Sequence, residues 1–239
     1  MTKFEALFGI KSSQIKKNCV LMPIIPKGFL EAFSIKAMAQ GKLYRTGLAP
    51  DFTLIATGIG PAFVGDAVLY LLETPCRNII LFGSCGLVKE KKGLSIGSLV
   101  TPVRCDDFGS FPDMLTDSQK PANLFFPNND LIGRFLSVCK KQEISPVRCC
   151  SVSSLKLEEE RTGCFLRNGI EVVDMECAAF FAAAAYAGLR AIALFYISDI
   201  ISKKPFYATL EPALQSKLSF SIRIAGSIIC EFIKKHLRD

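Results

Sequence analysis

Histidine is almost absent from this chain, whose 239 residues include only one, His236, close to the C-terminus. Mechanisms of the Ser-His-Asp and Cys-His types need a histidine beside the nucleophile, so most of them are excluded. The ten cysteines form no Cys-x-x-Cys pair, and several lie within apolar runs. We therefore expect free thiols in a reducing, cytoplasmic compartment, with no metal site and no organic cofactor.

Signals for secretion and for membrane insertion are also missing. The N-terminal segment is charged, and its first apolar run, 19–25, is short and contains Pro23. One stretch, 177–197, resembles a membrane span in composition, because Arg190 is its only charge. Gly188 and Arg190 divide it into an Ala/Phe-rich part and a β-branched part, which favours a buried helix followed by a buried strand.

The charge balance is basic. The net charge is +7, while half of the residues are hydrophobic and 21% are charged. This surplus favours anionic partners such as phosphate or phosphorylated metabolites, although a solvated basic surface explains it equally well. The basic residues are scattered and form no stripe with aromatic residues, so we expect no nucleic-acid partner and no membrane partner.

Strand-like and helix-like segments alternate along the chain without a linker or a repeat. The predicted strands are 19–25, 42–46, 52–57, 78–82, 97–104, 147–152, 170–173 and 189–197. The predicted helices are 27–40, 61–72, 130–141, 157–168, 175–187 and 211–237, with a long loop at 105–129. Central strands that are apolar on both faces predict a single three-layer α/β/α domain over residues 1–239, with a central mixed sheet.

Small residues follow the apolar strand at 78–82, in the order Gly83, Ser84, Cys85, Gly86. A tight turn of such residues at a strand end lets backbone N–H groups approach an anion or a sugar, and Ser84 adds a hydroxyl group. A purely structural turn fits the same residues equally well. No Gly-Lys-Ser/Thr sequence follows, which excludes a P-loop.

Acidic residues stand at two other predicted strand ends. Asp174 and Glu176 flank the start of an apolar helix, where they either cap the helix or bind the hydroxyl groups of a sugar. Asp199 ends the most apolar strand, so burial should raise its pKa and suit it to act as a general acid, unless it caps a turn. One carboxylate that binds a sugar and a second that donates a proton would suit cleavage of an N-glycosidic bond.

Together these motifs resemble the nucleoside phosphorylase and nucleosidase superfamily, which includes purine and uridine phosphorylases, methylthioadenosine/S-adenosylhomocysteine nucleosidase and futalosine hydrolase. The similar segments, in the family's order and spacing, are Thr57–Gly60, Gly83–Gly86, Val173–Ala179 and Ile197–Asp199. The resemblance runs from about Cys19 to the C-terminus. It implies a phosphorylase-like fold, a nucleoside as the small-molecule partner, and a homo-oligomer.

The resemblance also implies roles for individual residues. Glu176 would bind the ribose 2′- and 3′-hydroxyls, Met175 would pack against the sugar, and Asp199 would protonate purine N7 so that the base leaves neutral. Ser84 and its neighbours would line the side of phosphate or another nucleophile. The full set of substrate-binding residues expected is Gly58, Ile59, Ser84, Cys85, Gly86, Asp174, Met175 and Glu176.

The chain departs from the family's pattern on the nucleophile side. Leu81 and Gly28 stand where bacterial purine phosphorylases have phosphate-binding arginines. Lys27 and Arg45 are the nearest cations that could replace them. The water-activating glutamate of the nucleosidases is missing as well, and Glu31 comes too late to match it.

The base side departs from the pattern too. The aromatic residue that usually stacks on the base would fall near Ser154 and Leu155. Phe206 or Tyr207 could stack on the base instead, and the alternative is that both anchor their loop to the core.

We therefore expect cleavage of the N-glycosidic bond of a purine-like nucleoside, with phosphate narrowly preferred over water as the co-substrate. Hydrolysis of the methylthioadenosine or futalosine type is the first alternative. A protein that binds a nucleoside on the same fold without turnover is the second.

Overall fold

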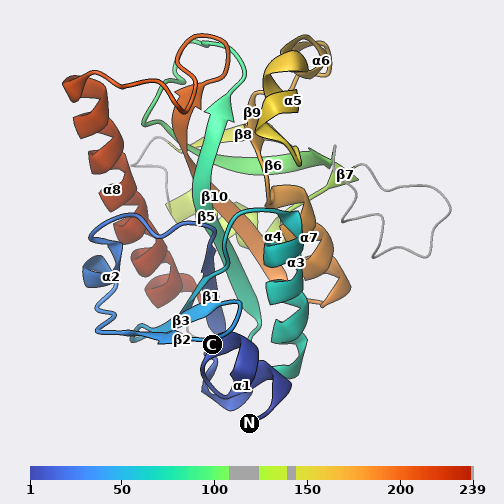
Figure 1. The fold of residues 1–239 in the computed structure, drawn as a ribbon, viewed down its shortest axis with the longest axis vertical. Coiled ribbons are helices and arrows are strands. Elements are labelled where there is room, and N and C mark those ends of the chain that lie inside the picture. The colour runs from blue at the N-terminus through green and yellow to red at the C-terminus, as the bar shows by residue number, and fades with distance from the viewer. Residues whose placement is uncertain (108–123, 139–143, 238–239) are drawn as a thin grey trace, which may run out of the picture.

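A computed structural model describes residues 1–107, 124–138 and 144–237 (Figure 1). The strands, which join in one mixed sheet, are β1 Asn18–Met22, β2 Met38–Gln40, β3 Arg45–Leu48, β4 Thr53–Ala56, β5 Asn78–Leu87, β6 Leu99–Asp107, β7 Leu124–Phe125, β8 Ser145–Ser151, β9 Val172–Asp174 and β10 Arg190–Ile200. The helices are α1 Lys3–Phe8, α2 Phe29–Ala32, α3 Pro61–Tyr70, α4 Asn129–Val138, α5 Leu155–Glu160, α6 Thr162–Arg167, α7 Cys177–Tyr186 and α8 Pro212–His236.

Helices cover both faces of the sheet. Successive side chains of a strand point to opposite faces, so a strand that is apolar throughout needs cover on both sides. In β1, Cys19 and Leu21 belong to the apolar cluster that includes α1, α3 and α7. Val20 and Met22 belong to the cluster that includes α2, α4 and α8. The predicted α/β fold with helices around a central mixed sheet is confirmed.

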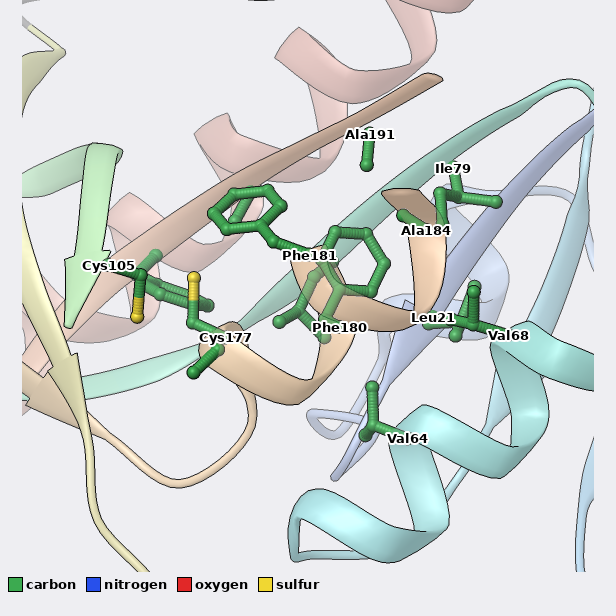
Figure 2. Packing of buried hydrophobic residues seen from close by; sticks show 14 of the residues in the cluster. Leu21, Val64, Val68, Ile79, Cys105, Cys177, Phe180, Phe181, Ala184 and Ala191 are labelled. Carbon is green, nitrogen blue, oxygen red and sulfur yellow. The ribbon is translucent and has the colours of Figure 1, made fainter. Parts of the chain in front are cut away.

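Helix α7 lies inside the first of these layers. Figure 2 shows its Phe180 and Phe181 beside the sheet and near Val64 and Val68 of α3. Every residue of α7 from Cys177 to Ala184 is buried, as an evenly apolar helix requires. The predicted buried helix followed by a buried strand is therefore confirmed, and none of the described helices has the length and apolar character that a membrane crossing needs.

Strand β5 is longer than predicted, and this change affects the site. Gly83–Gly86 do not form a turn, because they continue β5 and pair in parallel with β10 from Phe195 to Asp199. The register shifts between Ile197 and Asp199, which is a bulge in β10 at Ser198. A bulge re-aims the side chains that follow it, and it places Asp199 beside Gly86.

The helix predicted at 27–40 is wrong. Only Phe29–Ala32 are helical, and Ser34 then adopts a left-handed backbone with φ of 55°, which ends the helix. Met38–Gln40 form β2 and pair with β3, so sheet hydrogen bonds replace helical ones.

Other differences are smaller. The helix predicted at 157–168 is two short helices, α5 and α6, separated at Arg161. Within the predicted loop 105–129, β6 extends to Asp107 and β7 begins at Leu124, while 108–123 lie outside the described residues. The predicted helix at 130–141 is α4 as far as Val138, and 139–143 also lie outside the described residues.

Helix α1 was not predicted from the sequence. It begins with a capping box of Thr2 and Glu5.

Candidate active site

A pocket of about 320 Å³ opens beside the ends of β5, β9 and β10 and the start of α7. This volume lies at the small end of the range for ligand pockets in proteins. The predicted residues that line it are Ile59, Ser84, Cys85, Gly86, Asp174, Met175, Glu176, Asp199 and Phe206. Segments more than a hundred residues apart in the chain thus contribute to one cavity.

Glu176 connects α7 to the first glycine turn. Its Oε1 accepts a hydrogen bond of 2.7 Å from the backbone N–H of Gly60, whose φ of 114° favours glycine. The Glu176 side chain is buried, and burial raises its pKa to about 7. Glu176, for which the resemblance implies a role as ribose ligand, lines the pocket.

Asp174 has the capping role that the sequence left open for it. Its Oδ2 accepts hydrogen bonds from the backbone N–H groups of Glu176 at 3.0 Å and Cys177 at 2.7 Å. Its Oδ1 accepts a hydrogen bond of 2.5 Å from the hydroxyl of Ser151. Asp174 lines the pocket, but these bonds give its carboxyl a structural task, which is to hold the start of α7 and with it Glu176.

Asp199 follows the bulge in β10 and is 7% exposed. The hydroxyl of Ser198 donates a hydrogen bond of 2.5 Å to its Oδ1. Burial raises the pKa of Asp199, and the Ser198 hydrogen bond opposes this increase in part. A carboxyl group that keeps its proton closer to neutral pH is suited to general acid catalysis.

Glu158 is a pocket residue that the sequence analysis missed. It lies on α5 and is 7% exposed, and burial, followed by the charge of Asp199, raises its pKa to about 7. In the sequence it begins the run Glu158–Glu160, which is typical of a solvated helix face. Glu159 and Glu160 are exposed, whereas Glu158 is buried. The helix begins at Leu155, two residues before the predicted start, and the correct start of the helix is the signal that could have identified Glu158.

Four predicted residues do not line the pocket. Gly58 adjoins it in the chain, with a φ of 83°. Lys27 and Arg45, the predicted phosphate ligands, are exposed and do not line the cavity. Tyr207 is 68% exposed, and its hydroxyl donates to Glu159 at 3.0 Å, whereas Phe206 lines the pocket.

Three cysteine thiols from different elements meet in the core. The sulfur atoms of Cys105, Cys149 and Cys177 all lie within 4.8 Å of one another and are fully buried. Figure 2 shows Cys105 and Cys177 among the apolar side chains of the layer. The residues come from β6, β8 and α7, so no spacing in the sequence could have announced this group of soft metal ligands.

In a comparison against protein families, residues 29–229 match the family described as the phosphorylase superfamily. The chain belongs to this superfamily. It is thus an enzyme of the class that contains nucleoside phosphorylases and N-glycosyl hydrolases. A comparison with curated protein sequences finds no match.

Solved structures with the same fold include both kinds of enzyme. Uridine phosphorylase from Vibrio fischeri has a TM-score of 0.78 at 18% identity, covering 93% of each chain. 5′-Methylthioadenosine/S-adenosylhomocysteine nucleosidase from Campylobacter jejuni has a TM-score of 0.74 at 14% identity, covering 92% of this chain and 99% of that one. AMP nucleosidase from Bacteroides thetaiotaomicron has a TM-score of 0.70 at 14% identity, covering 94% and 96%. At such identities the similarity establishes the fold.

Proposed function

We propose that this enzyme cleaves the N-glycosidic bond of a purine nucleoside, with Glu176 as the ribose ligand and Asp199 as the general acid. The observation that carries the proposal is that these two buried carboxyl groups, both with a raised pKa, line one pocket from the ends of different elements. Paired acidic groups in different environments can divide binding and proton donation between them.

The proposed reaction breaks the bond between ribose carbon 1 and purine N9. The electron pair of that bond moves into the base, and the proton of Asp199 passes to N7, so the base leaves as a neutral molecule. The sugar carries a developing positive charge, which the Glu176 carboxylate stabilises while it accepts hydrogen bonds from the sugar hydroxyls. An oxygen nucleophile then bonds to carbon 1 from the side of Ser84. When this nucleophile is water, it releases one proton to the solvent, and Asp199 takes up one proton from the solvent before the next turnover.

Water is the co-substrate that we favour, although the sequence narrowly favoured phosphate. Four acidic side chains line the pocket, namely Glu158, Asp174, Glu176 and Asp199. The lining contributed by the described residues includes no lysine, arginine or histidine. A phosphate dianion would therefore have carboxyl groups as its neighbours, which is an unfavourable electrostatic environment.

Phosphorolysis is the second candidate, and one observation favours it. Ser84 lines the pocket from an exposed position on β5, where its hydroxyl can donate a hydrogen bond to an anion.

The test is an assay of the enzyme with adenosine, inosine and uridine, each with and without phosphate. Hydrolysis predicts free ribose that does not depend on phosphate, whereas phosphorolysis predicts ribose 1-phosphate only when phosphate is present. Asp199→Asn should lower kcat about 10²–10⁴-fold, the range for loss of a general acid. Asp130→Asn, on the exposed surface of α4, is the matched control and should keep full activity. Bound nucleoside with no turnover under any condition would favour a binding protein instead.

We further propose a cytoplasmic homo-oligomer that needs no metal and no organic cofactor. The nine cysteines in the described ranges are all free thiols, which supports a reducing compartment. Light scattering during gel filtration tests the assembly, and full activity after treatment with a chelator is the result expected for the cofactor proposal.

A further inference from the structure

Two carboxyl groups face each other across Gly86 inside the pocket. The position that a Cβ atom on Gly86 would occupy lies 3.0 Å from Oε1 of Glu158 and 3.2 Å from Oδ2 of Asp199. Both oxygen atoms therefore border the same small space above β5, and only a residue without a side chain leaves that space open. Both residues line the pocket, so one ligand can contact both of them.

The surroundings of this carboxyl pair oppose two negative charges. Burial is the first cause that raises the pKa of each group, and for Glu158 the charges of Asp199 and Glu159 raise it further, to about 7. Within the described part of the chain, the Ser198 hydroxyl is the one group that favours the charged form of Asp199. Two neighbouring carboxyl groups in such a place ionise one at a time, so the pair passes through a state that holds one proton.

We propose that Glu158 and Asp199 together recognise the base, and that their single shared proton selects a 6-aminopurine. When a base is bound, the shared proton lies on Asp199, which donates a hydrogen bond to N7, and the Glu158 carboxylate accepts a hydrogen bond from the 6-amino group. This assignment rests on the proposed function, because that function places N7 of the base at Asp199. The assignment adds a second base-binding residue, Glu158, and a class of base to the proposed function.

The selectivity follows from the hydrogen-bonding groups of the base. Adenine presents an acceptor at N7 beside an amino donor, whereas a 6-oxopurine presents two acceptors, N7 and O6, on the same edge. One donor and one acceptor in the pocket complement adenine, while a 6-oxopurine would set its O6 against the carboxylate of Glu158. Uracil has no N7 but offers an acceptor beside an N–H donor, so it is the competitor that must be tested.

Calorimetric binding of the free bases adenine, hypoxanthine and uracil at pH 7 tests the proposal without requiring turnover. For the wild-type enzyme we expect adenine to bind at least about tenfold more tightly than either competitor, which is the effect of one hydrogen bond to a buried charged group. Glu158→Gln keeps the size of the side chain but supplies an amide donor that suits O6. It should reduce the ratio of adenine to hypoxanthine affinity to below about threefold.

The matched control is Glu160→Gln, on the same helix but with an exposed side chain paired to Lys156. This variant should leave the affinity ratio unchanged. If Glu158→Gln does not fold, Gly86→Ala provides the second variant, because its methyl group would enter the space between the carboxyl oxygens and abolish adenine binding.

The outcomes separate this inference from the proposed function. Equal or tighter binding of hypoxanthine or uracil to the wild type, no binding of any base, or an unchanged ratio in Glu158→Gln would each overturn the inference. Selective adenine binding that Glu158→Gln removes, in an enzyme that cleaves no nucleoside, would support the recognition pair and reject the catalytic function.

Discussion

Replacing Glu158 by glutamine should make the stability of the protein less dependent on pH. The carboxyl group of Glu158 has a pKa of about 7 in the folded protein and an ordinary value of 4.5 when exposed. Its folded pKa is the higher one, so its contribution to stability is fully present below pH 4.5 and is lost as the pH rises through 7. Glutamine cannot ionise, and Glu158→Gln should therefore be neutral at pH 5 or slightly destabilising, but stabilising at pH 8.

The magnitude follows from the same two pKa values. A pKa raised from 4.5 to about 7 corresponds to a ceiling of about 3 kcal/mol at pH 8, at about 1.4 kcal/mol for each pH unit. The pocket opens to solvent, which screens part of this effect, so about half of it is expected, or about 1.5 kcal/mol. For a protein of this length that energy corresponds to an increase in Tm of about 3–6 °C.

Urea denaturation of the wild type and the variant at pH 5, 6, 7 and 8 measures this effect directly. The difference in unfolding free energy should grow steadily in favour of Glu158→Gln as the pH rises. Glu160→Gln serves as the control, since it makes the same substitution at an exposed side chain of the same helix. A difference that stays constant from pH 5 to 8, or that favours the wild type at pH 8, would refute the reasoning from burial.

Three other substitutions test the activity and the stability of the site. If Glu176 binds ribose as proposed, Glu176→Gln should lower kcat/KM about 10–100-fold in steady-state kinetics, because the sugar loses a charged hydrogen-bond acceptor. Gly86→Ala should lower activity at least about tenfold and unfolding free energy by about 1–3 kcal/mol, because its Cβ would stand 3.0–3.2 Å from two carboxyl oxygens. Ser151→Ala should lower unfolding free energy by about 2 kcal/mol in a urea titration, because it leaves Asp174 and a backbone amide of α7 without their buried partner. Unchanged stability would contradict the structural role given to the Ser151 hydroxyl.

Local sequence predicted the elements whose stability depends on burial alone. The apolar strands near 78–82 and 189–197 and the apolar helix near 175–187 were found because their composition matches two buried faces or a fully buried helix. The extension of β5 through Gly83–Gly86 was missed, since glycine and serine carry no strand signal and the extension depends on pairing with β10. The same reason explains the missed strand β2, which exists through its pairing with β3.

The sequence by itself determined the superfamily. It also indicated that Glu176 and Asp199 lie at the ends of buried elements, because the apolar runs beside them are visible in the sequence, and both residues line the pocket. Tertiary structure decided what the sequence left open. It assigned Asp174 to the start of α7 through Ser151, and it brought Glu158, which looks like part of a solvated acidic run, beside Asp199. The physical reason is that the charge, burial and hydrogen bonds of a carboxyl group depend on neighbours from distant segments, which only the folded sheet brings together.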